Sequence, residues 1–299
     1  MNDPNGIPDA ARAHRKGVLL MIGAGLCWST GGVLVRSVVL TDPWEIVFWR
    51  SVFLVVFMIG VLTLWHRAKV FEKIFEVGFP GVLAGALLAS TFFFFILSVT
   101  RNTVANTLVL MSVGPFFVAL SGRIFLGERV SLRTWGTISA ALVGIVLMFS
   151  EGLDSGRTIG NLLALGVPAA FGLNVVILRR THASVSMAPA VMLAGIFSIL
   201  VSLPLAWPLT PTVRDFVVLG IMGWVQLGIG CVLMVVAARY LSAAEIGLFA
   251  LLETILGPIW VWLGFGERPT DMALVGGLLV IFALLLNGLL GMRERSSPG

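Results

Sequence analysis

Ten apolar runs of roughly twenty residues lie one after another along this chain, with short polar segments between them. An α-helix needs about 20 apolar residues to cross the ~30 Å hydrocarbon core of a bilayer. A mean hydropathy of +1.01, with only 12% charged residues, is also far above what a water-soluble domain of this size tolerates. The sequence therefore predicts an all-α membrane protein with ten transmembrane helices. The predicted spans are 17–38, 44–65, 77–99, 103–125, 133–150, 159–178, 187–207, 215–237, 244–265 and 271–291.

Several other classes of protein do not fit these runs. A β-barrel needs strands that alternate apolar and polar residues, whereas the long run from Ala273 is apolar on both faces. The first run follows Arg12, Arg15 and Lys16 as in a secretory leader, but it is too long and ends without a cleavage site. The net charge of +5 is scattered over span ends and forms no stripe, so we expect no nucleic-acid partner.

The distribution of basic residues predicts the orientation in the membrane. With ten spans and a cytoplasmic N-terminus, fourteen Lys and Arg residues fall on the cytoplasmic side and five on the outer side. Cytoplasmic loops carry the excess of Lys and Arg in membrane proteins. We therefore expect cytoplasmic tails at 1–16 and 292–299, in a multi-pass protein of the inner membrane.

The chain contains an internal repeat. Residues 100–105 align with 238–243, and Gly114-Pro115 then falls close to Gly257-Pro258. Matching positions in the two halves are about 138 to 146 residues apart. The repeat predicts two related units.

Each unit holds five predicted spans, at 17–150 and 151–291. A unit with an odd number of spans ends on the opposite side from its start, so the second unit inserts upside down. Inverted repeats of this kind are typical of secondary transporters that work by alternating access.

Several motifs along the chain are typical of one known family. They are Trp28-Ser29, Pro43 with Arg50, Gly114-Pro115 to Gly127-Glu128-Arg129, and Gly257-Pro258 to Gly266-Glu267-Arg268. With these motifs the chain resembles the EamA-type exporters, the ten-helix branch of the drug/metabolite transporter superfamily, and is most like the YddG-like exporters of amino acids. The resemblance implies export of small metabolites, often neutral or aromatic amino acids, across a bacterial inner membrane.

Glu253 is the strongest candidate for a functional residue, because it is the only carboxylate well inside a predicted span. An acid in a membrane is costly and usually serves a function. Glu253 is predicted either to couple transport to protons or to contact a substrate amine, and a structural hydrogen bond is the alternative. Arg50 lies about two turns inside the second span, where snorkelling or pairing with Asp42 or Glu45 is favoured over contact with a substrate carboxylate.

The remaining candidates for a central cavity are polar or aromatic. Buried amides need partners, so they indicate a polar cavity, and mid-span Trp residues favour a cavity wall, although hydroxyl groups more often join helices. Pro115, Pro168 and Pro258 are candidates for gating kinks or for fixed bends. The predicted cavity residues are Trp28, Ser29, Asn106, Phe171, Asn174, Trp224, Gln226 and Glu253.

The two Gly-Glu-Arg motifs are predicted to end helices. Gly127 and Gly266 suit the positive φ of a helix end, and Glu128 and Glu267 suit the positive end of the next helix. Four more residues separate Pro from Gly in the first copy, so we expect the fourth helix to reach further than the ninth.

A secondary transporter is therefore the leading hypothesis. The alternatives are an exporter of other organic solutes or drugs, and, from other classes, an intramembrane enzyme, a channel or a scaffold. No motif indicates an enzyme, a nucleotide, a cofactor or a metal, and none indicates an obligatory protein partner. Neutral zwitterions are favoured over cationic drugs because the first span lacks an acid.

Overall fold

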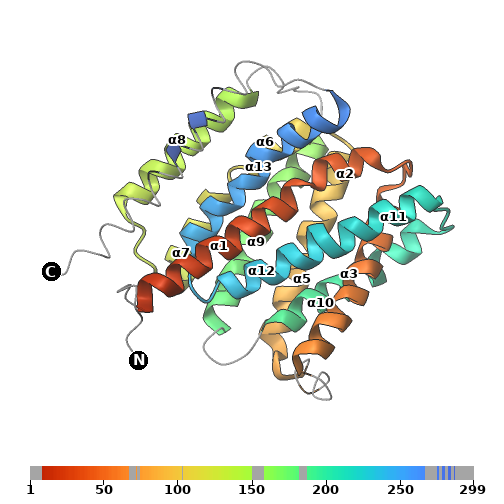
Figure 1. Ribbon diagram of the computed structural model, residues 1–299, viewed down its shortest axis with the longest axis horizontal. Coiled ribbons are helices and arrows are strands. Elements are labelled where there is room, and N and C mark those ends of the chain that lie inside the picture. The colour runs from red at the N-terminus through yellow and green to blue at the C-terminus, as the bar shows by residue number, and fades with distance from the viewer. Residues whose placement is uncertain are drawn as a thin grey trace.

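The computed structural model describes residues 9–66, 72, 75–102, 104–149, 158–181 and 187–266, and single positions between 275 and 286. The described elements are all helices (Figure 1). In chain order they are α1 (Asp9–Ser29), α2 (Gly31–Ser37), α3 (Pro43–His66), α5 (Gly78–Val99), α6 (Val104–Met111), α7 (Gly114–Leu126), α8 (Leu132–Phe149), α9 (Thr158–Thr181), α10 (Ala188–Ala206), α11 (Val213–Ile221), the π-helix η2 (Met222–Ile229), α12 (Gly230–Ala237) and α13 (Ala243–Phe265).

Seven spans within the described residues are long and apolar enough to cross a membrane. They correspond to the first three predicted spans and to the sixth through ninth. The fourth predicted span is divided into α6 and α7, and the fifth corresponds to α8. The tenth, 271–291, lies largely outside the described residues, so the count of ten remains a prediction.

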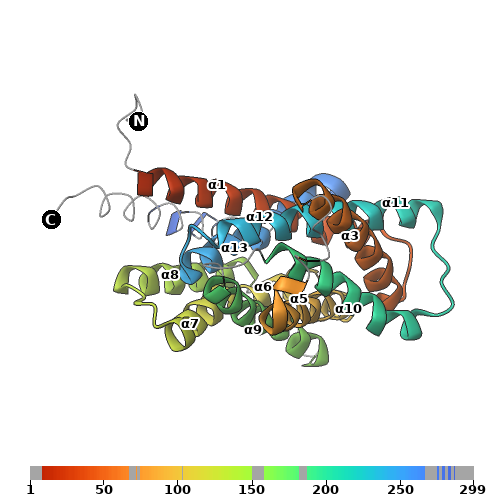
Figure 2. The same ribbon diagram turned by 90° about the horizontal axis from the view of Figure 1, so that it is seen from below.

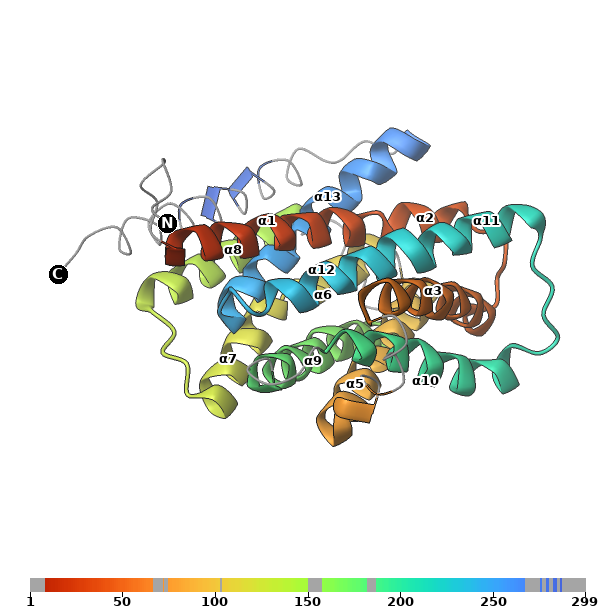
Figure 3. The same cartoon turned by 60° about the horizontal axis from the view of Figure 1, so that its bottom comes forward.

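The helices form two layers (Figures 2 and 3). One layer contains α1, α12 and α13, with α1 packed against both of the others. The second contains α5, α7 and α9, with α9 packed against both α5 and α7. Beside the first layer lies α3, which packs against η2, and beside the second lies α10, which packs against α5. The layers meet where α3 packs against α10 and where α7 packs against α13.

Exchange of the two halves of the chain reproduces this packing. The contact of α5 with α9 exchanges with that of α12 with α1, and the contact of α7 with α9 exchanges with that of α13 with α1. The pairs α3 with α10 and α7 with α13 each exchange with themselves. Each layer therefore contains helices from both halves, and a space between the layers is bounded by both.

The surface and the interior have the polarity expected of a protein in lipid. Large apolar side chains such as Phe79 and Leu132 are 76% and 89% exposed. Polar side chains such as Ser98 are fully buried, where its hydroxyl contacts Thr107 Oγ1 and the Gly160 carbonyl, both at 2.9 Å. In lipid, such interhelical hydrogen bonds stabilise packing that the hydrophobic effect does not drive.

The two Gly-Pro motifs differ in local structure. Pro115 lies in the first turn of α7, after α6 has ended at Met111, so it begins a new helix and does not kink a continuous one. Proline fits there because an N–H in the first turn has no acceptor within the helix. Pro258 lies inside the unbroken α13, and Pro168 lies inside α9.

The expected difference in length between the fourth and ninth spans is not found. The 8 residues of α6, the 13 of α7 and the two residues between them match the 23 residues of α13. The first copy has four more residues after its proline, but it has four fewer before it, because Pro115 lies earlier in its span than Pro258 does in α13.

Both helix-ending glycines have the predicted conformation, with φ of +66° at Gly127 and +72° at Gly266. We expected Glu128 to cap the next helix, but it caps the distant α13 instead. Its Oε2 accepts a hydrogen bond from the Ala243 backbone N–H (3.1 Å), and its Oε1 accepts one from Arg179 Nε (2.7 Å). Glu128 thus joins the ends of α7 and α9 to the start of α13, while Glu267 lies outside the described residues.

A second contact ties the same end of the bundle. The N-cap Ser242 and Glu245 form a reciprocal capping box at the start of α13. Glu245 Oε1 also contacts His14 Nε2 on α1, at 2.8 Å. The start of α13 is therefore held by α1, α7 and α9 together.

Candidate functional site

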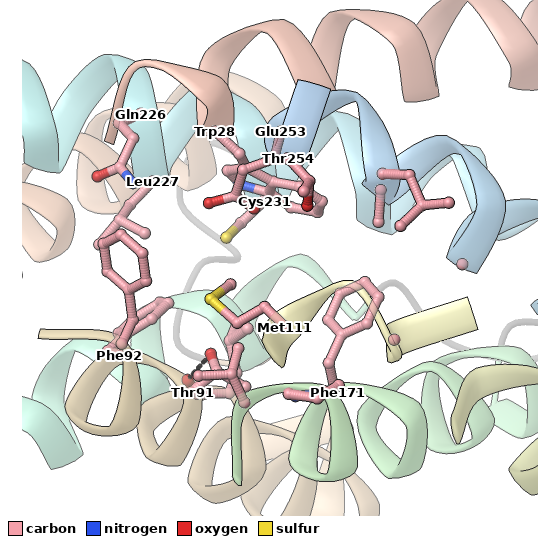
Figure 4. Close-up of a pocket in the computed structure, with 18 of the residues that line it drawn as sticks. Trp28, Thr91, Phe92, Met111, Phe171, Gln226, Leu227, Cys231, Glu253 and Thr254 are labelled. Atoms are coloured by element: carbon pink, nitrogen blue, oxygen red, sulfur yellow. Dashed lines mark hydrogen bonds between the residues drawn. The ribbon is translucent and has the colours of Figure 1, made fainter. Parts of the chain in front are cut away.

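A cavity with about 820 Å³ of empty space, its mouth included, lies between the two layers. Figure 4 shows side chains of one layer facing those of the other across it. From α1, η2, α12 and α13 come Trp28, Gln226, Leu227, Cys231, Glu253 and Thr254. From α5, α6 and α9 come Thr91, Phe92, Met111 and Phe171.

Aromatic rings form much of the wall. Trp28 on α1 and Phe171 on α9 approach edge to face, with ring centroids 5.9 Å apart. This geometry is favourable for aromatic pairs. The indole fits because position 230 is glycine, where a Cβ atom would lie 2.5 Å from Trp28 Nε1. The cavity therefore suits an apolar or aromatic group.

The π-helix places a polar group in this wall. Gln226 and Leu227, both in η2, line the cavity. A Cβ atom at Gly31 would lie 2.5 Å from Gln226 Nε2, so glycine at this position lets the amide group lie close against α2. Gln226 Oε1 has no hydrogen-bond partner among the described residues. Segments of π-helix are frequent at functional sites because they change the direction of side chains.

Glu253 lies on α13 and lines the cavity beside Thr254. Its carboxylate makes no hydrogen bond or ion pair within the part of the chain that the structure describes. The structural hydrogen bond considered for Glu253 is therefore not found among the described residues. The side chain faces the cavity instead.

Arg50 also lines the cavity, and its predicted snorkelling is wrong. The side chain is 1% exposed, and one guanidinium nitrogen donates to the Phe92 carbonyl at 3.1 Å. Neither acid suggested as a partner is paired with it, since Glu45 accepts from the Thr210 N–H (2.6 Å) and Asp42 from the Trp44 N–H (2.9 Å). Proximity in sequence misled the prediction, because both acids are engaged by backbone N–H groups, Asp42 by its neighbour Trp44 and Glu45 by the distant Thr210.

The structure brings four of the eight predicted cavity residues together: Trp28, Phe171, Gln226 and Glu253. Pro115 and Pro168 also line the cavity, while Pro258 does not. The side chain of Asn106 lies outside the described part of the structure.

Three predicted residues lie elsewhere. Ser29 is buried and accepts a hydrogen bond from Trp260 Nε1 at 2.7 Å. Asn174 is buried between α9 and α5 and donates to the Ala84 carbonyl at 2.8 Å. Trp224 is 47% exposed on the outside of the bundle. Polarity and depth alone do not show which face of a helix a residue occupies.

Sequence reasoning also missed cavity residues. Phe92 and Phe95 on α5 belong to a run of four Phe residues in which the sequence does not show which rings face the lipid, and Thr91 immediately precedes that run. Thr254 follows Glu253 directly, and that adjacency was the available signal. Among the described residues, no three His, Cys, Asp or Glu side chains gather as a metal site would require.

Comparison with known proteins agrees with this architecture. The EamA-like transporter family matches residues 15–150 and again residues 158–289. This chain belongs to the EamA-like transporter family. It is therefore a transporter and not an enzyme, and a multi-pass protein of the inner membrane.

Among its relatives, the pseudopaline exporter CntI of Pseudomonas aeruginosa (strain UCBPP-PA14) is 27% identical over 285 residues, 91% of this chain and 95% of that protein. Protein RarD of Escherichia coli (strain K12) is 26% identical over 54% of each chain. The riboflavin transporter of Rhizobium johnstonii is 24% identical over 64% of each. The named cargoes of EamA-like relatives thus differ from one another.

A solved crystal structure shares the fold of this EamA-like chain. It has a TM-score of 0.79 at 15% sequence identity, and the match covers 93% of this chain and 98% of the other. At this level of identity the likeness concerns the fold alone. The substrate has to be inferred from the cavity.

Proposed function

We propose that this EamA-like transporter exports small metabolites, most favourably neutral or aromatic amino acids, and that it is close in function to the YddG-like exporters. The observation that carries the proposal is the cavity between the layers, with aromatic walls and the two charged residues Arg50 and Glu253. Cavities that are mostly apolar, with a few placed polar groups, are typical sites for small molecules. An amino acid with an apolar side chain presents the matching set of groups.

Alternating access is the mechanism that the arrangement supports. Because exchange of the two halves reproduces the helix contacts, a second state is expected in which each half takes the present conformation of the other. The proposal includes ten spans, inverted repeats at 17–150 and 151–291, and cytoplasmic tails at 1–16 and 292–299. The excess of Lys and Arg on one side supports this orientation.

The two ends of the cavity are the natural gates. Pro115 and Pro168 line it, and α6 and α7 separate just before Pro115. A break in a transmembrane helix leaves backbone groups free to bind a solute or to bend. We assign this break as the hinge of the fourth span, whereas Pro258 in the ninth span lies inside the unbroken α13 and does not line the cavity.

Counterflow in liposomes tests the proposal. Purified protein is reconstituted with an internal pool of one unlabelled compound, and uptake of its labelled form is followed for amino acids, sugars and quaternary amines. We expect uptake of neutral and aromatic amino acids above empty liposomes. Uptake of sugars or quaternary amines without any amino acid would refute the proposed substrate class and favour an exporter of other solutes or drugs.

A further inference from the structure

We propose that Arg50 is the specificity-determining residue of this cavity and selects substrates that carry a carboxylate. The inference rests on the proposed function, and it names which part of the substrate is recognised and by which side chain. Arg50 and Glu253 are the two charged residues among the described residues that line the cavity.

First, Arg50 is a buried cation without a counter-ion among the described residues. Arg50 is 1% exposed and has no ion pair with a carboxylate in the described part of the chain. Its Nε has no hydrogen-bond partner there either. Charged groups are rarely buried unless they are paired, because desolvation disfavours them strongly. A chain that places arginine here needs a partner that the described residues do not supply.

The second step is the fixed position of the guanidinium group. One of its nitrogens donates to the Phe92 carbonyl at 3.1 Å, and the group lies over the Phe92 ring, 5.3 Å from the ring centroid. The hydrogen bond to the carbonyl and the cation–π contact with the ring both hold the guanidinium group, but neither neutralises its charge. Phe92 itself lines the cavity, so Arg50 is held against the cavity wall with donors left over.

The third step is the chemistry of a matching ligand. Arginine has five N–H donors in a planar fork that fits a carboxylate with two hydrogen bonds. Glu253 projects from α13, in the layer opposite α5 and its Phe92, and its carboxyl oxygens can accept hydrogen bonds from an amine. A zwitterion therefore has one partner for its carboxylate at Arg50 and one for its amine at Glu253.

The position is specific to one half of the chain. Arg50 follows Pro43 by seven residues, and the equivalent position after Pro189 is Ile196. Packing common to both halves therefore does not require a cation. The single arginine gives a nearly symmetric cavity one carboxylate-binding end.

The test is competition in the counterflow assay with labelled L-phenylalanine. Unlabelled L-phenylalanine, L-phenylalaninol and phenethylamine share the ring and the amine, but only the first has a carboxylate. Hydrogen bonds to charged groups predict that the wild-type protein binds the two analogues about 10- to 100-fold more weakly. In Arg50→Gln this preference falls to about threefold or less, and in Arg50→Lys, which keeps the charge, it persists in reduced form.

Arg101→Gln is the matched control, because Arg101 is exposed beyond the end of α5 and its removal costs the same charge. A purely structural role of Arg50 would change the rate for all three compounds and leave their ratio unchanged. The ligand series on the wild-type protein stands even where Arg50→Gln fails to fold. Equal competition by phenylalaninol overturns the Arg50 assignment and leaves the proposed function intact. Absence of any amino-acid counterflow overturns both.

Discussion

Replacing Glu128 with alanine removes an acceptor that joins the ends of three helices. Its two carboxylate oxygens accept from Arg179 Nε at 2.7 Å and from the Ala243 N–H at 3.1 Å. Arg179 also donates to the Ala238 carbonyl at 3.3 Å, so the same side chain fixes the end of α12. The substitution therefore loosens α7, α9 and α13 where they meet.

The magnitude follows from the two bonds. A carboxylate that caps a helix contributes about 1 kcal/mol. The ion pair with Arg179 is partly exposed, at 19% and 26% for the two side chains, and contributes about 1–2 kcal/mol after screening. We expect Glu128→Ala to lower the free energy of unfolding by about 2–3 kcal/mol, and Glu128→Gln by about half of that.

A double-mutant cycle separates the ion pair from the cap. The free energies of unfolding of wild type, Glu128→Ala, Arg179→Ala and the double variant are measured by denaturant titration in mixed micelles. We expect a coupling energy of about 1–2 kcal/mol, and none above about 0.5 kcal/mol between Glu128 and the exposed Arg180. Additive effects of Glu128→Ala and Arg179→Ala would show that the ion pair between the two side chains does not contribute to stability.

Four further substitutions test the site. Glu253→Gln should abolish the dependence of transport on an imposed pH gradient, or transport itself, and retained proton-driven efflux would contradict a role for this acid in coupling. Gly230→Ala places a Cβ atom 2.5 Å from the rigid Trp28 indole and should lower the free energy of unfolding by about 1–3 kcal/mol. In Gly31→Ala the new Cβ atom meets the flexible end of Gln226, so this substitution should alter substrate affinity with less effect on thermal unfolding. Asn174→Ala should lose about 1 kcal/mol from its bond to the Ala84 carbonyl and leave the substrate preference unchanged, and a changed preference would return Asn174 to the binding site.

Much of the architecture follows from the length of the apolar runs. A run long enough to cross a bilayer has few alternatives to a helix, which is why seven predicted spans are found. Six of them lie within three residues of their expected ends, and the first begins six residues earlier than expected. The glycines of the Gly-Glu-Arg motifs were predictable for a similar reason, because a residue with positive φ strongly favours glycine.

The site was harder to predict because side-chain direction is not encoded by depth. Asn174 and Gln226 are both buried amides, yet one joins two helices and the other lines the cavity. Gln226 lies in the π-helix η2, so its position does not follow the 3.6-residue period from which a helix face is counted, whereas Asn174 lies in the α-helix α9. Arg50 was misjudged because the nearby acids were assumed to be free to pair with it, and both are engaged with backbone N–H groups.

The exported solute is expected to pass through the cavity between the two layers. The direct measurement compares amino-acid counterflow by wild type, Ala250→Trp and Leu263→Trp, all on the same reconstituted scale. Both substitutions lie on α13, but Ala250 lines the cavity and Leu263 is 68% exposed on the outside. We expect Ala250→Trp to fold and lose counterflow, whereas Leu263→Trp transports normally. Undiminished counterflow by Ala250→Trp would show that the solute takes another route.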